Sequence, residues 1–139
     1  MKILLAADGS SFTKKALAFL VANPNLLADG ELLVLHVQPN LPPRVTAFVG
    51  AKAIDDYHRD EAGQVLAPIE EFLKRHGIAF TCKWMVGSPV DEIVKASRRE
   101  AAHMIVMGTH GYGLLGRTVM GSVAQSVLAD AEVPVLLVK

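Results

Sequence analysis

The segment MGTHGYGLLGRTVMGSV, residues 107–123, carries the strongest structural signal in the sequence. It follows a short apolar stretch at 103–107 and leads into apolar residues at helical spacing, among them Met120, Val123 and Val127. A glycine-rich connection between an apolar strand and an amphipathic helix is typical of a parallel α/β unit. The segment therefore predicts a strand, a glycine-rich loop and a helix in that order.

The same alternation of strand and helix extends over the rest of the chain. Apolar blocks bounded by turn residues predict strands at 2–7, 31–37, 78–86, 103–107 and 133–138. Most of these blocks are nearly continuous in apolar residues, as expected for strands that helices cover on both faces. The 139 residues are enough for one domain, with little left for a second module.

Longer amphipathic segments lie between the predicted strands. Ser88 is expected to cap a helix that has Pro89 in its first turn, and a second helix is expected from about Ile54 to His76, with Gly63 and Pro68 as candidate kinks. Residues 38–50 hold three prolines and are expected to form an extended loop that acts as a lid or interaction surface.

Composition narrows the function classes. Lys and Arg number 14 and Asp and Glu number 14, so the formal net charge is zero and no excess of positive charge favours nucleic acid. The apolar runs are too short to cross a bilayer or to form a signal peptide, so no membrane association is expected. Cys82 is the single cysteine, which excludes an internal disulfide and favours the cytoplasm.

Two glycine patterns overlap in the decisive segment. Gly111, Gly113 and Gly116 match the dinucleotide pattern G-x-G-x-x-G, but no acidic residue lies at the end of the next predicted strand to bind a ribose. The second pattern is G-x2-G-x9-G-S, formed by Gly108, Gly111, Gly121 and Ser122. Two early glycines would allow close backbone approach to a ligand, and the helix that begins near Ser122 would offer free N–H groups to phosphate. A glycine-rich turn with a serine cap and no ligand is the alternative.

Signals for catalysis and for metal binding are weak. His110 lies in the glycine-rich loop, but no serine, cysteine or second histidine stands at a telling distance, which favours a loop contact over acid–base catalysis. A metal cluster could be built from Asp55, Asp56, His58, Asp60 and Glu61, but most of these residues are expected to face solvent and to form a charged helix surface. His36, His76 and His103 are expected to be structural, and Cys82 and Trp84 to be packing residues.

The chain resembles the universal stress protein family in stretches distributed over its whole length. These are ILLAADGS (3–10), LLVLHV (32–37), VGSPVDEIVKAS (86–97), MGTHG (107–111) and GSVAQSVLADAEVPVLLVK (121–139). The resemblance implies a single domain over 1–139, with a Rossmann-like α/β fold and a five-stranded parallel sheet of order 3-2-1-4-5 covered by helices on both faces. It also implies ATP or another adenine nucleotide at the carboxyl edge of the sheet, in the nucleotide-binding branch of the family.

The resemblance further implies a role for individual residues. Asp8 would lie near the ribose, Val37 would bind adenine through its backbone, and Met107 would lie under the nucleoside. The remaining contacts would surround the ribose and the phosphates. They would come from Gly108, His110, Gly111, Gly121, Ser122 and Val123. Arg117 is a candidate basic residue, while Gly116 stands where many relatives carry a cation, so the loop has one cation fewer than usual.

Three function classes remain open. The first is a homodimeric stress or signalling protein that binds ATP and changes its affinity for a protein partner. The second is an enzyme that uses ATP, and the third is a dimeric protein with an empty site. The intact glycine pattern favours the first, with Mg²⁺ expected beside the nucleotide and at most weak hydrolysis. The apolar strand at 133–138 has few features that protect an edge strand, which predicts that it pairs with its own copy.

Overall fold

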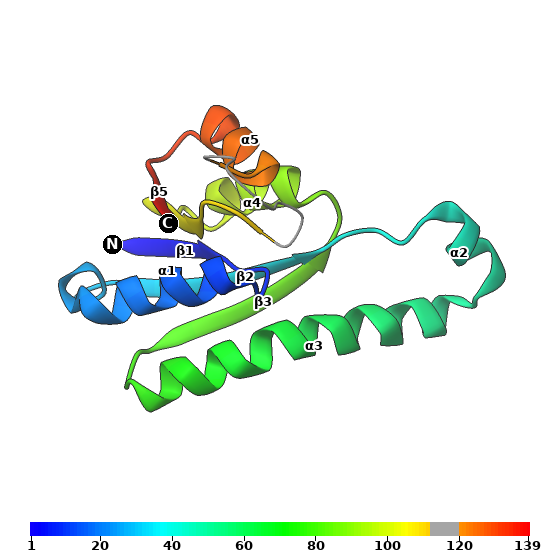
Figure 1. Cartoon of the computed structure of the whole chain (residues 1–139), viewed down its shortest axis with the longest axis horizontal. Helices are drawn as coiled ribbons and strands as arrows, with labels where there is room; N and C mark the ends of the chain where they lie inside the picture. Colours follow the sequence, from blue (N-terminus) through cyan, green and yellow to red (C-terminus); the bar gives the residue numbers. More distant parts are fainter. Residues whose placement is uncertain (112–119) are drawn as a thin grey trace.

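The computed structural model describes residues 1–111 and 120–139. In these residues five strands alternate with helices (Figure 1). The elements are β1 (Lys2–Ala6), α1 (Ser11–Ala22), the 3-10 helix η1 (Pro24–Leu26), β2 (Glu31–Gln38), α2 (Pro43–Phe48), α3 (Ala51–Arg75), β3 (Phe80–Val86), α4 (Pro89–Arg99), β4 (Met104–Gly108), α5 (Ser122–Asp130) and β5 (Val135–Val138).

The strands form one parallel sheet of order β3-β2-β1-β4-β5. This confirms the predicted fold class, and each strand boundary lies within two residues of its prediction. The chain proceeds from β1 outward to β3 and then returns to place β4 on the other side of β1. In such sheets the crevice for a ligand lies outside the carboxyl ends of the two strands where the order reverses. Here these strands are β1 and β4.

Helices cover the sheet on both faces (Figure 1). On one face Leu17 of α1 and Leu66 of α3 pack with Ile3 and other side chains of the sheet. On the other face Ile93 of α4 and Val127 of α5 pack with Leu4 and its neighbours. Full burial of one such side chain stabilises the fold by about 1.5–3 kcal/mol. The central strand β1 is therefore fixed from both sides, and its carboxyl end is a rigid place for a site.

Strand β3 departs from the expectation that strands are covered on both faces. Side chains alternate between half-buried and exposed along much of it, and Trp84 is 37% exposed. The reason is the sheet order, because β3 lies at one edge and α4 packs against β2 rather than over β3. Trp84 was predicted to be a packing residue, but about a third of its surface is exposed to solvent.

The proline-rich segment 38–50 is not an extended loop throughout. Gln38 belongs to β2, and residues 43–48 form α2, with Pro43 in its first turn, where the missing N–H leaves no hydrogen bond unmade. The following helix α3 begins at Ala51, three residues before its predicted start. Together α2 and the first turns of α3 extend away from the sheet (Figure 1), and Phe48 there is 89% exposed.

The helices α1, α4 and α5 differ in how the backbone N–H groups of their first turn are capped. The Ser10 side chain accepts a hydrogen bond from the Thr13 backbone N–H at 3.4 Å and caps α1. The predicted cap of α4 by the Ser88 side chain is not made, and Ser88 contributes its backbone carbonyl to Glu92 N–H instead. Gly121 is the N-cap residue of α5, with no side chain to occupy the space before that helix.

Membrane insertion has no candidate helix among the residues that the structure describes.

Candidate functional site

A cavity of about 540 Å³ opens at the carboxyl edge of the sheet, where β1 and β4 end. Its lining includes eight of the nine residues that the sequence analysis assigned to a nucleotide. They are Asp8, Val37, Met107, Gly108, His110, Gly111, Ser122 and Val123. Gly121, the ninth, is the N-cap of α5 and does not line the cavity. These eight residues come from four segments that are distant in sequence and that meet at one hollow.

Asp8 lies two residues after the end of β1 and is fixed by the N-cap and the first turn of α1. Its Oδ1 accepts hydrogen bonds from Ser10 N–H at 2.9 Å and from the Thr13 hydroxyl at 2.8 Å. The Thr13 hydroxyl also accepts the Asp8 backbone N–H at 3.1 Å. With Oδ1 occupied on the protein side, Oδ2 lies toward Gly111. Asp8 thus offers one oriented carboxylate oxygen at the cavity.

Gly108 and Gly111, the two early glycines of the pattern, are each required for a different physical reason. A Cβ on Gly111 would lie 2.5 Å from Asp8 Oδ2, so a side chain here would displace the carboxylate that lines the cavity. A Cβ on Gly108 would instead overlap Cβ of Phe12 and approach the Phe12 backbone. Gly108 lines the cavity but is required for packing β4 against α1, which corrects the expectation that both glycines serve approach to a ligand.

The backbone of Val37 faces open space because β1 ends before it. Ala7 N–H donates to the Leu35 carbonyl at 2.9 Å, so the backbone groups of Leu35 point toward β1. Gly87 N–H donates to the Gln38 carbonyl at 3.0 Å, so those of Gln38 point the opposite way, toward β3. Backbone groups of a strand alternate between its two neighbours, so the N–H and C=O of Val37 point past the end of β1. They form a donor and acceptor pair at the cavity.

Helix α5 directs its amino end at the same cavity. Gly121 N–H donates to the Thr109 carbonyl at 2.6 Å, and Thr109 N–H donates to Val138 at 3.0 Å, which ties the helix start to β4 and β5. Ser122, Val123 and Ala124 form the first turn of α5 and all line the cavity. The N–H groups of a first helical turn have no acceptor within the helix and carry a partial positive charge. An anionic group would be stabilised there.

Several lining residues were not assigned to the site from the sequence. His36 and Gln38 of β2 were read as structural or loop residues, and Glu61 and Val65 come from α3. Glu61 and His58 are the members of the acidic stretch that do not face solvent: Glu61 lines the cavity, and His58 is 4% exposed. The four-residue spacing of Glu61 and Val65 was the sequence signal that could have placed both on one face of α3, toward the cavity. The other acids of the stretch, Asp55, Asp56 and Asp60, are exposed as expected.

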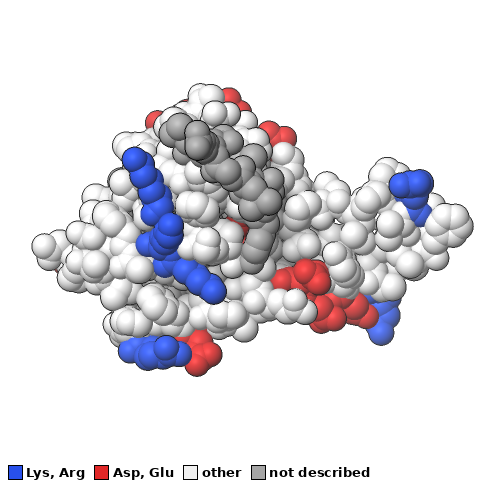
Figure 2. Space-filling view, in the orientation of Figure 1, with Lys and Arg blue, Asp and Glu red and all other residues white. Residues whose placement is uncertain are grey.

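Acidic rather than basic groups face the described part of the cavity. Asp8 and Glu61 line it, and no Lys or Arg does among residues 1–111 and 120–139. Figure 2 shows acidic side chains gathered along α3. No cluster of three or more His, Cys, Asp or Glu residues with metal-binding geometry occurs in the part of the chain that the structure describes. Gly113, Gly116 and Arg117, which the sequence analysis discussed, lie outside the described residues.

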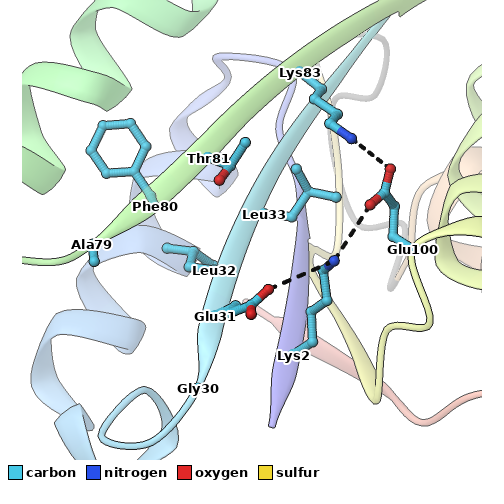
Figure 3. A pocket seen from close by; sticks show the side chains of 10 residues that line it. All are labelled: Lys2, Gly30, Glu31, Leu32, Leu33, Ala79, Phe80, Thr81, Lys83 and Glu100. Atoms are coloured by element: carbon cyan, nitrogen blue, oxygen red, sulfur yellow. Dashed lines mark hydrogen bonds and ion pairs between the residues drawn. The ribbon is translucent and has the colours of Figure 1, made fainter.

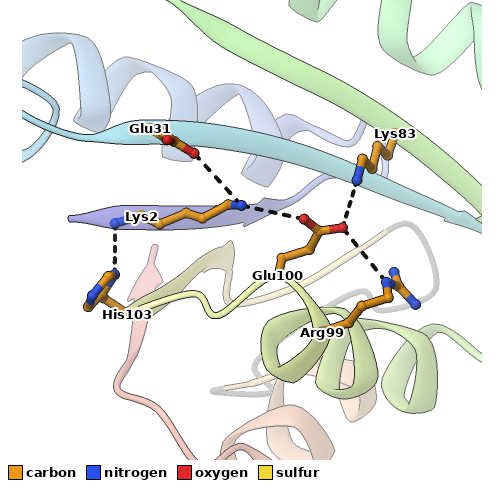
Figure 4. A network of polar contacts seen from close by, with 6 residues as sticks. All are labelled: Lys2, Glu31, Lys83, Arg99, Glu100 and His103. Carbon is orange, nitrogen blue, oxygen red and sulfur yellow. Dashed lines mark hydrogen bonds and ion pairs between the residues drawn. The ribbon is translucent and has the colours of Figure 1, made fainter.

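A second hollow of about 350 Å³ lies at the opposite, amino edge of the sheet (Figure 3). Its polar side chains bind one another. Glu100 accepts hydrogen bonds from Lys83 at 2.6 Å and from Lys2 at 3.4 Å, and Arg99 lies 3.7 Å from it (Figure 4). Lys2 also pairs with Glu31 at 3.7 Å. The hydrogen bond from Lys83 lowers the pKa of Glu100, and this effect is larger than the opposing effect of burial. The pKa therefore lies below its ordinary value of 4.5.

The remaining candidate nucleophile is not activated. Cys82 lies half-buried on β3 and packs against the core. Burial and, secondly, the nearby Glu70 carboxylate raise the pKa of its thiol to about 12. A thiol reacts as the thiolate, so Cys82 is a packing residue, as its sequence context indicated.

Comparison with known proteins places the chain among relatives of the same fold. A family model described as the universal stress protein family matches residues 1–139. The universal stress protein MJ0531 of Methanocaldococcus jannaschii is 31% identical over 99% of this chain and 81% of its own length. A universal stress protein of Thermus aquaticus is 34% identical over 99% of this chain and 97% of its own length.

Solved structures agree with this placement. The structure of MJ0577, a universal stress protein of M. jannaschii, matches with a TM-score of 0.85 at 31% identity, covering 99% of this chain and 94% of that one. An Archaeoglobus fulgidus universal stress protein in complex with dAMP matches with a TM-score of 0.73 at 23% identity, covering 100% and 98%. A family protein of Arabidopsis thaliana with AMP bound has a TM-score of 0.71 at 18% identity, covering 100% and 91%. The chain belongs to the universal stress protein family.

Proposed function

We propose that this protein binds an adenine nucleotide in the cavity at the carboxyl edge of its sheet. The observation that carries the proposal is the convergence, on one cavity at the switch point between β1 and β4, of eight residues that the family resemblance implied. The adenine base would lie at the backbone of Val37, the ribose at Asp8 Oδ2 and the phosphates at the first turn of α5. Each of these groups offers the polarity that its part of the nucleotide requires.

Relatives support this choice of ligand class. Proteins of the same fold from A. fulgidus and A. thaliana hold dAMP and AMP respectively. At their level of identity they support the fold, and the assignment of nucleotide to this chain rests on its own residues. ATP is the ligand that we propose on the basis of the glycine pattern, with AMP as the alternative that the same cavity would accommodate.

Mg²⁺ would accompany a triphosphate in this site. The described lining offers the first turn of α5 and no Lys or Arg to balance phosphate charge, so a divalent cation would be needed there. The ion would be held by phosphate oxygens, because the described residues form no cluster able to bind it alone. When bound, Mg²⁺ neutralises phosphate charge. The residues of the chain bind and orient the nucleotide.

We propose a binding and signalling role rather than an enzymatic one. Cys82 has no activated thiol, and the described cavity shows no dyad of acid and base positioned for hydrolysis. Slow hydrolysis is the alternative, and it predicts turnover well below about 1 per second, the low end of ordinary enzymes. A multiple-turnover assay with Mg-ATP separates the two, since faster turnover would assign the protein to the enzyme class.

A homodimer through β5 is the proposed assembly, with nucleotide-dependent affinity for a protein partner as its proposed use. Strand β5 lies at the edge of the sheet next to β4, and its four residues are half-buried in the single chain. Pairing with its own copy would satisfy the outward backbone groups of that edge. Sedimentation at micromolar concentration tests the dimer, and a monomer would contradict it. The cytoplasm is the proposed location, since the single cysteine fits a reducing compartment.

Calorimetry tests the nucleotide proposal directly. Titration of the wild type with ATP, Mg-ATP and AMP should give binding heat, and Mg-ATP should bind more tightly than ATP alone. Gly111→Val should strongly weaken nucleotide binding because the new Cβ would lie 2.5 Å from Asp8 Oδ2 at the cavity, while leaving the unfolding temperature nearly unchanged. Absence of heat at millimolar nucleotide, or normal binding by the variant, would contradict the proposed site.

A further inference from the structure

Two side chains at the end of β2 form a hydrogen-bonded chain beside the proposed base position. His36 is 5% exposed, and its Nδ1 lies 2.8 Å from the carbonyl oxygen of Ala7. Its Nε2 lies 3.0 Å from the terminal amide of Gln38, measured to Oε1. His36 and Gln38 both line the cavity, and Gln38 directly follows Val37, whose backbone points into it. The hydrogen-bonding groups of His36 and Gln38 therefore lie where the base of a bound nucleotide would lie, and they can favour one base over another.

The carbonyl group of Ala7 determines which ring nitrogen of His36 carries the proton. A carbonyl oxygen can only accept, so His36 Nδ1 must carry hydrogen and donate to it. If Nε2 carried hydrogen as well, the ring would be a buried cation, and no carboxylate pairs with His36 anywhere in the described residues. Burial of an unpaired charge is strongly unfavourable. In a neutral imidazole one ring nitrogen donates and the other accepts, so with Nδ1 donating to Ala7, Nε2 is the acceptor.

A neutral ring fixes the orientation of the Gln38 amide. The oxygen and the nitrogen of a terminal amide exchange places by a half-turn about the last side-chain bond, with almost no change in shape. The hydrogen bond to His36 then decides between the two orientations. Because Nε2 of His36 accepts, the Gln38 NH₂ group donates to it, and Gln38 Oε1 turns away from the ring. Oε1 is then not used by the ring and can accept a hydrogen bond from a ligand in the cavity that Gln38 lines.

We propose that Gln38 determines base specificity and that His36 is the positioning residue that orients it. This inference rests on the proposed function, which places a purine base at the Val37 backbone. Oε1 of Gln38 accepts a hydrogen bond from the exocyclic amino group of adenine. A 6-oxopurine presents an oxygen at the same point, so two acceptors would face each other without a proton between them. The cavity thus selects 6-aminopurine nucleotides over 6-oxopurine nucleotides.

Calorimetry with AMP and IMP tests the selection, because these nucleotides differ only at the purine 6-position and its neighbouring ring nitrogen. The wild type should prefer AMP by about tenfold or more, the effect of one buried unpaired acceptor. Gln38→Met keeps the length of the side chain and removes the amide, and should lower the AMP to IMP ratio by about fivefold. The Val37 backbone supplies the remaining preference.

Gln64→Met is the matched control. Gln64 lies on α3 and lines the neighbouring groove between α1 and α3, but not the cavity, so its loss should leave the ratio unchanged. An unchanged ratio in Gln38→Met, with AMP still bound, would overturn this inference and leave the proposed function standing. Failure of the wild type to bind either nucleotide would overturn the proposed function and this inference with it.

Nitrogen NMR of the unliganded wild type tests the role of His36 without any nucleotide. The ring nitrogens should show hydrogen on Nδ1 and none on Nε2 near neutral pH, and His36→Phe should lower the AMP to IMP ratio as Gln38→Met does. A proton found on Nε2 would turn the Gln38 NH₂ group to the cavity and predict preference for IMP. That result would overturn the inference.

Discussion

At the amino edge of the sheet, Glu100 accepts hydrogen bonds from Lys83 and Lys2, so the charged groups of that hollow are bound to one another. At the carboxyl edge, Asp8 uses only Oδ1 for hydrogen bonds to the residues that the structure describes, and the backbone of Val37 points past the end of β1. Both hollows contain charge and both lie beside β1. The difference shows that a polar hollow indicates a ligand only where its polar groups are oriented by the fold and left facing the space.

The largest effect is expected for Gly108→Ala at the carboxyl edge. The new Cβ would overlap Phe12 Cβ and press on the Phe12 backbone, so relief requires a shift of α1 or β4. Overpacking of this kind should lower the free energy of unfolding by about 3 kcal/mol. Urea unfolding measures it, with Gly63→Ala as control. Gly63 lies inside α3 with no neighbour near the new Cβ, and alanine there should stabilise by about 0.5–1 kcal/mol. A stable Gly108→Ala would mean that this glycine serves the ligand alone.

Gly111→Ala should instead damage binding and spare the fold. Its Cβ would stand 2.5 Å from Asp8 Oδ2 and displace the carboxylate that we propose as the ribose contact. Loss of one oriented, charged hydrogen bond corresponds to about 10-fold to 30-fold weaker AMP binding. Calorimetry measures this loss, and Gly50→Ala, with no neighbour near its Cβ, is the control of the same chemistry. Unchanged affinity in Gly111→Ala would show that Asp8 does not contact the nucleotide.

A smaller and pH-dependent effect is expected at the amino edge from Glu100→Gln. The lowered pKa of Glu100 means that its ionised form stabilises the folded protein above pH 4.5, and that this contribution is lost as the pH falls through the lowered folded-state value. The wild type should therefore be more stable than the variant near neutral pH, and the difference should shrink toward about pH 3. Urea unfolding at the two pH values gives the answer.

Glu71→Gln serves as the control for that experiment. Glu71 pairs with Arg75 at 3.0 Å on the exposed surface of α3, where an ion pair contributes little. Its removal should change stability only slightly at either pH. A Glu100→Gln variant that follows the control would contradict the stabilising role assigned to the network. AMP binding should be unaffected in both variants, since neither residue lines the carboxyl-edge cavity.

The smallest effect is a gain of stability at the amino edge. Ala101 follows α4 and Glu100 with φ of +52°, a left-handed conformation that costs free energy in any residue with a Cβ. Ala101→Gly should raise the free energy of unfolding by about 0.5–1 kcal/mol. Ala129→Gly, inside α5 and equally exposed, should lower it by a similar amount. Destabilisation by both variants would show that Ala101 carries no strain.

The sequence was sufficient where periodicity is local. The apolar blocks predicted all five strands, and the glycine pattern with the family resemblance predicted eight residues that line one cavity. The sequence was insufficient where the exposure or the contacts of a residue depend on which elements lie beside its strand. Trp84 is exposed because β3 lies at an edge, and Gly108 contacts Phe12 because β4 lies beside α1.

The same limit applies to His36 and Gln38. Period-two alternation places both on one face of β2, where they can contact each other, but the acceptor at Ala7 that orients His36 requires β1 as a neighbour. The helix α2 within the proline-rich segment escaped prediction for another reason, since Pro42 and Pro43 favour a loop and a helix start equally.

Chemical-shift mapping by NMR during titration with AMP tests the contrast between the two edges most directly. We predict large, saturable changes at the backbone amides of Val37, Gly111 and Ser122, and no changes at Lys2, Lys83 and Glu100. Changes centred on the amino edge, or none at either edge with millimolar AMP, would contradict the assignment of the carboxyl-edge cavity as a nucleotide site.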